Sequence, residues 1–182
     1  MEPQISTSKG QIIAKFGLIY SLLLIALNLI MYITGMQNQM KSVTFFITMS
    51  MILGSVYFGI ISRRNNTLGG FITYGQSVGT GMLISLVGGL IMAVYSYLFV
   101  TIIDPEMITN GLLETKRQMI EQNKSEEEIE MAMKWGKKLS TPLMVIVFSI
   151  LLNLFYGLVA SLIIAIFTKR EDPDSQYNSL NS

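Results

Sequence analysis

Residues 139–168 read LSTPLMVIVFSILLNLFYGLVASLIIAIFT and contain no charged side chain. An α-helix needs roughly 20 consecutive apolar residues to cross the hydrocarbon core of a bilayer. Three earlier stretches are also uncharged and long enough to cross, namely 16–40, 42–62 and 65–103. The sequence therefore predicts four membrane-spanning helices.

The composition agrees with this pattern. Of the 182 residues, 51% are hydrophobic and 14% are charged, against about 25% charged in soluble domains. The chain has no cysteine and no histidine, which removes disulfides, thiol nucleophiles and the commonest metal ligand. We therefore expect no enzymatic activity and no catalytic, metal or cofactor site, and the net charge of +1 gives no indication of nucleic-acid binding.

The predicted fold class is all-α, an integral membrane four-helix bundle in one domain over 1–182. The polar tails are 1–15 and 169–182, and the predicted spans are 16–35, 42–62, 77–103 and 140–168. A short turn joins the first two spans into an antiparallel hairpin, with Arg63 and Arg64 marking the water boundary. The first span is longer than a signal-peptide core and lacks a small-residue cleavage pattern, so we expect it to be an anchor.

The segment 104–138 lies between the third and fourth spans and is predicted to be an amphipathic helical hairpin or helix pair outside the membrane. Asp104, Pro105 and Glu106 are typical of an N-cap, a first helical position and an acidic first turn. A capping box over 125–128 predicts a second helix. The acidic run 126–130 lacks the spacing of a calcium loop, so a solvated helix face is the favoured interpretation.

Small side chains recur every four residues along the last two spans. The third span carries Ser77, Gly81, Ser85, Gly89 and Ala93, and the fourth carries Ser149, Asn153, Gly157, Ser161 and Ala165. Small residues on one face allow helix backbones to approach closely in lipid. Intrachain packing of these two ladders is the favoured interpretation, with homodimerisation and a polar substrate groove as alternatives.

Ionisable residues are expected to be absent from the interior of the spans, which argues against a proton-coupled pump. Asn28 and Asn153 are the strongly polar residues there. Each is expected to make an interhelical hydrogen bond. A Gly-x-x-x-Gly pair at Gly75 and Gly79 is a weaker indication of helix packing, because it lies near the expected interface.

Three ordered motifs carry a resemblance to a known family. They are GGFITYGQ at 69–76, the run from Tyr95-Ser96-Tyr97 to Ile102-Ile103-Asp104-Pro105-Glu106, and the acidic helix before Ser140-Thr141-Pro142. With these motifs the chain resembles the domain of unknown function 4199 family over about residues 9–169. The resemblance implies a small four-span protein of the bacterial cytoplasmic membrane, and it implies no particular activity, cofactor or site residue.

Two functions remain open from the residues. The first is a non-catalytic membrane protein that acts through helix packing and association, with the lipid bilayer, a second copy or another membrane protein as partner. The alternative is a small transporter or channel component for an unknown solute. An enzyme would depend on Asp104, Glu106 or a loop acid, none of which has a second catalytic partner at a usable spacing.

Basic residues decide the expected orientation. Six lysines and arginines are expected on the side of the membrane that holds both termini, and seven on the opposite side. More of the first six lie close to a membrane edge. We therefore expect both termini in the cytoplasm.

Overall fold

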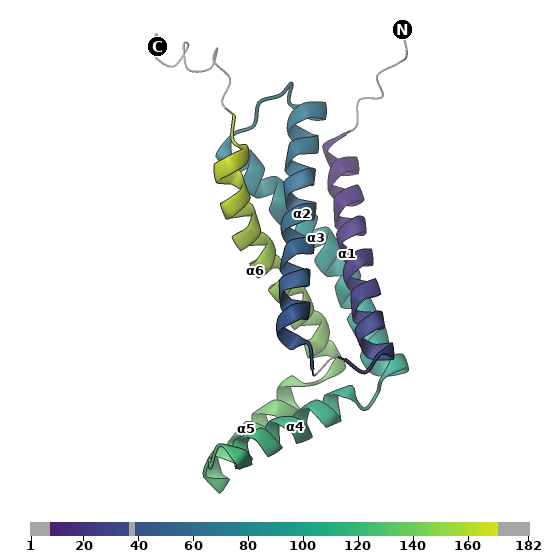
Figure 1. Ribbon diagram of the computed structural model, residues 1–182, viewed down its shortest axis with the longest axis vertical. Helices are drawn as coiled ribbons and strands as arrows, with labels where there is room; N and C mark the ends of the chain where they lie inside the picture. Colours follow the sequence, from purple (N-terminus) through teal and green to yellow (C-terminus); the bar gives the residue numbers. More distant parts are fainter. Residues whose placement is uncertain (1–7, 37–38, 171–182) are drawn as a thin grey trace. The chain divides into compact units, whose positions relative to one another are not determined.

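The computed structural model describes residues 8–36 and 39–170. Within these ranges the chain is helical apart from short turns and a single β-bridge (Figure 1). The helices are α1 (Lys9–Ile33), α2 (Lys41–Thr67), α3 (Tyr74–Leu98), the π-helix η1 (Phe99–Ile103), α4 (Met107–Glu121), α5 (Glu126–Leu139) and α6 (Pro142–Thr168). Four helical segments are long and apolar enough to cross a membrane, namely α1, α2, α3 with η1, and α6. The predicted all-α membrane bundle is confirmed.

Contacts divide the chain into two compact units. The first comprises Met1–Ile91 and Leu151–Ser182, and so holds α1, α2, most of α3 and most of α6. The second, Met92–Ile150, holds the end of α3, η1, α4, α5 and the start of α6.

In the first unit, α3 lies against each of the other three helices. A methyl group added to Gly17 of α1 would lie 2.7 Å from Cγ1 of Val87, and one added to Gly59 of α2 would overlap the Ile84 side chain. A methyl group on Gly81 would overlap the Ser161 hydroxyl of α6. The glycines therefore permit backbone approaches that any larger residue would prevent, and these approaches replace the hydrophobic drive that lipid does not supply.

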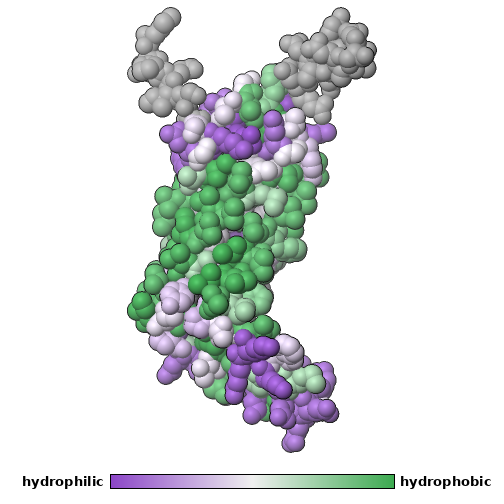
Figure 2. Space-filling model, turned by 180° about the vertical axis from the view of Figure 1, so that it is seen from behind, coloured by the Kyte–Doolittle hydropathy of each residue, from purple (hydrophilic) through white to green (hydrophobic). Residues whose placement is uncertain are grey.

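The two small-residue ladders face each other, as the favoured interpretation predicts. Gly81 meets Ser161, and Gly157 meets Ser85, in antiparallel register. All five ladder residues of α3 are buried, as are Gly157, Ser161 and Ala165 on α6. On the face drawn in Figure 2, hydrophobic side chains cover the middle of the bundle, which is the distribution that a lipid environment favours.

Three helix ends differ from the sequence prediction. Helix α1 begins at Lys9 and not near residue 16, because Ser8 and Gln11 form a capping box. Helix α2 continues to Thr67, so Arg63 and Arg64 lie inside the helix and do not follow it. Helix α3 begins at Tyr74, earlier than expected, because Thr73 and Gln76 form a reciprocal capping box. The amide of Gln76 donates to Thr73 Oγ1 at 3.3 Å, and the amide of Thr73 donates to Gln76 Oε1 at 3.1 Å.

In the second unit, the predicted N-cap at Asp104 is wrong. Asp104 caps the end of η1, its carbonyl accepts from the amide of Met107 at 3.2 Å, and α4 begins after this turn with Glu106 as its N-cap. The capping box of Ser125 and Glu128 at the start of α5 is confirmed. Helices α4 and α5 pack together, and a methyl group on Gly136 would lie 2.7 Å from Cδ2 of Leu112.

The start of α6 follows its sequence signal. Thr141 Oγ1 accepts a hydrogen bond from the amide of Met144 at 3.3 Å, and Pro142 is the first helical residue. Proline is favoured at this position because its missing N–H would have no intrahelical partner.

Candidate functional site

Arg63 is the strongest candidate for a functional side chain, and no sequence motif identifies it as one. Arg63 is only 9% exposed and lies four residues before the end of α2, in the last turns of the candidate span Ser42–Thr67. The water boundary at Arg63 stays a prediction, whereas its burial against α3 is a finding of the structure. A buried charge is costly unless hydrogen bonds compensate for the lost hydration.

The Arg63 guanidinium joins α2 to the first turns of α3. Its Nη1 donates to the carbonyl of Gln76 at 3.1 Å and also to Thr80 Oγ1. The Thr80 hydroxyl in turn donates to the same Gln76 carbonyl at 2.6 Å. Nε of Arg63 is buried and has no hydrogen-bond partner in the described residues. The guanidinium is thus held by neutral oxygens, and its Nε–H is a buried donor without a partner among the described residues.

A second set of contacts ties the α2–α3 loop to the end of α6. Nη1 of Arg64 donates to the Thr168 carbonyl at 3.3 Å. Ile72 and Arg170 form an antiparallel bridge in which the N···O distances are 2.8 and 2.9 Å. The Arg170 guanidinium also lies 5.7 Å from the centre of the Phe71 ring, in the range of a cation–π contact.

All these charges have one sign. Arg63, Arg64, Lys169 and Arg170 gather at this end of the first unit, and the described residues of that unit include no aspartate or glutamate. Figure 2 shows hydrophilic side chains collected at this end of the bundle. Such a cluster attracts anions, including lipid phosphates.

Polar side chains continue inward from Arg63. Ser77 and Ser85 of α3 are buried, and their hydroxyls have no hydrogen-bond partner among the described residues. Tyr20 of α1 donates to Asn153 Oδ1 of α6, which confirms the interhelical bond expected for Asn153. The hydroxyl of Ser161 donates to the Gly157 carbonyl one turn earlier in its own helix at 2.5 Å.

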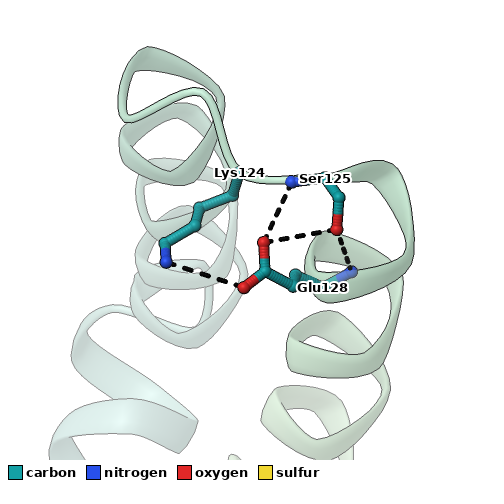
Figure 3. Close-up of polar contacts among 3 residues, drawn as sticks. All are labelled: Lys124, Ser125 and Glu128. Carbon is teal, nitrogen blue, oxygen red and sulfur yellow. Dashed lines mark hydrogen bonds and ion pairs between the residues drawn. The ribbon is translucent and has the colours of Figure 1, made fainter.

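The acidic run at the start of α5 is arranged as a helix cap (Figure 3). The Glu128 carboxylate accepts from the amide of Ser125 at 3.0 Å and lies 3.6 Å from Nζ of Lys124. The backbone hydrogen bond from Ser125, followed by the charge of Lys124, lowers the pKa of Glu128. Among the described residues, no three His, Cys, Asp or Glu side chains group as metal ligands would.

The helices and their packing define the class of protein. Four long apolar helices around a close-packed interior make the chain a multi-pass α-helical membrane protein. More particularly, the chain belongs to the family described as protein of unknown function (DUF4199), whose model matches residues 15–170. This confirms the family resemblance. A search of curated proteins and a search of solved structures found no match.

Proposed function

We propose that this chain is a non-catalytic protein of the bacterial cytoplasmic membrane that acts by associating, within the bilayer, with a second copy of itself or with another membrane protein. The absence of histidine and cysteine from the sequence supports the non-catalytic part. One face of α3 supports the association.

Helix α3 carries small residues on two faces, and among the described residues the bundle fills only one of them. The face with Gly81 meets Ser161, whereas a methyl group on Gly75 or Gly79 would meet nothing within 4 Å. Gly75 and Gly79 lie one helical turn apart, so their open surfaces are adjacent. A Gly-x-x-x-Gly face allows transmembrane helices of different chains to pack closely. This open pair is the observation that carries the proposal.

The test is crosslinking in intact membranes, followed by gentle extraction and mass identification of what is captured. Gly79→Leu should abolish a dimer or a captured partner and leave the bundle folded, because the new side chain enters open space. Gly54→Leu is the matched control, since Gly54 of α2 also faces open space but is followed one turn later by Phe58. Unchanged capture in the Gly79 variant would contradict the proposal.

Transport is the second candidate, and the buried hydroxyls favour it. Ser77 and Ser85 present hydroxyl oxygens that have no partner within residues 8–36 and 39–170, on the helix to which Arg63 also bonds. A passive path can be lined by hydroxyls and carbonyls without charge. Proteoliposomes should then show a solute flux that Ser85→Ala alters and Gly54→Leu does not. An absence of flux for all tested ions and small solutes would count against this candidate.

A further inference from the structure

Charge is divided along α5. The first half carries Glu126, Glu127, Glu128 and Glu130, whereas the second half carries Lys134, Lys137 and Lys138 and no acid. The basic half ends at Leu139, and α6, a candidate span, begins at Pro142. The lysines therefore lie next to the membrane end of the helix, and the acids lie at the far end.

An apolar stripe on α5 is not used in packing against α4. Met131, Trp135 and Leu139 follow one another at intervals of four residues, and their side chains are 56%, 54% and 42% exposed. Residues on the opposite side, such as Gly136, lie against Leu112 of α4. The stripe is thus a second apolar face on a helix that otherwise carries charge.

The side chains around the stripe suit the headgroup region of a bilayer. The Trp135 ring has Nζ of Lys138 at 5.2 Å from its centre, and Lys134 lies one turn before Lys138. Tryptophan is enriched where hydrocarbon meets the headgroups, and lysine places its alkyl chain along apolar surface and its ammonium group at the lipid phosphates.

The hairpin is also attached to the membrane at both ends. Helix α4 begins four residues after the third span ends at Ile103, and α5 ends three residues before α6 begins. Met131 is two turns from Leu139, about 12 Å along the helix axis. The whole stripe can therefore lie on the bilayer surface without stretching either connection.

We propose that α5 binds the surface of a bilayer containing anionic lipid. Met131, Trp135 and Leu139 enter the boundary between headgroups and acyl chains, and Lys134 and Lys138 bind lipid phosphates. The glutamates near Ser125 remain in water. Amphipathic helices with a basic polar side bind membranes in this way. This proposal is independent of the association through α3.

The opposite side of the hairpin is a less suitable lipid contact. There a groove between α4 and α5 is lined by Leu113, Ile120 and Met133, and its charged lining residues have both signs, Lys116, Lys124 and Lys137 with Glu126 and Glu130. The glutamates offset much of the attraction of these lysines to anionic headgroups, whereas the second half of α5 carries lysines and no acid on any side.

Fluorescence offers a direct test because Trp135 is the sole tryptophan of the chain. The full-length protein is reconstituted in vesicles of phosphatidylcholine with phosphatidylglycerol, and quenching by lipids labelled near the headgroup is compared with quenching by aqueous iodide. Trp135 should be quenched by the lipid label and protected from iodide. A Trp135 that is quenched mainly by iodide would overturn the proposal.

A matched pair of reporters separates surface binding from mere proximity to the span. In a Trp135→Phe background, Met131→Trp places the reporter on the stripe, and Glu130→Trp places it one residue away on the groove side. The reporter at 131 should respond to the lipid label and the reporter at 130 to iodide.

Equal iodide quenching at both sites means that the helix projects into water, and equal lipid quenching means that the stripe does not set its orientation. Either result overturns the proposal. Protection of position 131 from both quenchers means that protein covers the stripe, which also overturns it.

The charge requirement has its own control. Each lysine near an anionic surface contributes about 1 kcal/mol to binding, or about fivefold in the ratio of bound to free helix. Lys134→Gln with Lys138→Gln should therefore reduce lipid quenching at position 131 in the anionic vesicles. Lys116→Gln with Lys124→Gln, which removes the same charge from the groove side, should not. Equal effects of the two pairs would contradict a specific role for the stripe.

Discussion

At the scale of single residues, the interior of the first unit is sensitive to volume at some glycines and tolerant at others. Gly81 and Gly79 are two residues apart on α3, yet a methyl group meets Ser161 at the first position and nothing within 4 Å at the second. The difference arises because α6 lies against only one face of α3. Residue identity alone does not distinguish these two glycines.

We predict that Gly81→Ala and Gly79→Ala change stability in opposite directions. Overpacking at Gly81 should lower the free energy of unfolding by about 1–3 kcal/mol. Gly79→Ala should raise it by about 0.5–1 kcal/mol, because alanine loses less backbone entropy than glycine in a helix. Reversible unfolding in detergent micelles measures both changes, and equal effects would show that α6 does not contact Gly81.

The buried Arg63 leads to a second prediction. Arg63→Met should lower stability by about 1–3 kcal/mol, since the two hydrogen bonds from a charged group are lost and the relief of desolvation offsets part of that loss. The adjacent Arg64→Met is the matched control, because Arg64 is more exposed and its hydrogen bonds, to Asn65 Oδ1 at 3.2 Å and to the Thr168 carbonyl at 3.3 Å, are long. Unfolding in micelles should show the larger loss for Arg63, and equal losses would contradict its structural role.

At the scale of elements, local capping signals decide where several helices begin. Ser125 with Glu128 starts α5, and Thr73 with Gln76 starts α3. Both boxes are legible in the sequence, and we recognised only the first because the second lies in a glycine-rich stretch. Asp104 illustrates the converse, since the end of η1 occupies the residue that would otherwise cap α4.

The start of α5 should respond to pH. The Ser125 amide and the Lys124 charge lower the pKa of Glu128 below its ordinary value of 4.5, so the folded helix favours the ionised carboxylate. This stabilisation is fully present above about pH 4.5 and is lost as the pH falls through the lower folded pKa. Amide exchange at residues 126–129, corrected for the intrinsic pH dependence, should therefore accelerate in acid. In Glu128→Gln the acceleration should disappear, and its persistence would assign the effect to another group.

At the scale of the whole molecule, the terminal side of the chain is rich in basic residues. Figure 1 shows the start of α1 and the ends of α2 and α6 at the same end of the first unit. Lys9 begins α1, Arg63 and Arg64 lie in the last turns of α2, and Lys169 and Arg170 follow α6. Positive residues near the ends of spans are retained in the cytoplasm. The lysines of α5 act in the opposite sense, so the balance between the two groups decides the orientation.

We predict cytoplasmic termini. A reporter that is active only outside the cytoplasmic membrane should be silent when fused after Ser182 and active when inserted at Asn123, in the turn between α4 and α5. Replacing Arg63, Arg64, Lys169 and Arg170 together with glutamine should weaken or invert this pattern. A signal at Ser182 in the unaltered chain would reverse the orientation.

The sequence by itself determined the number of spans, the all-α class, the helical hairpin between the third and fourth spans and the two small-residue ladders. These features depend on local quantities, because hydropathy decides which segments enter lipid and residue spacing decides which side chains share a helix face. Only the tertiary structure decided that Gly81 meets Ser161, that Gly75 and Gly79 face open space, and that Arg63 is buried against Thr80. Each of these depends on the register and rotation of one helix against another, which are set by many weak contacts between residues far apart in the chain and by no single local signal.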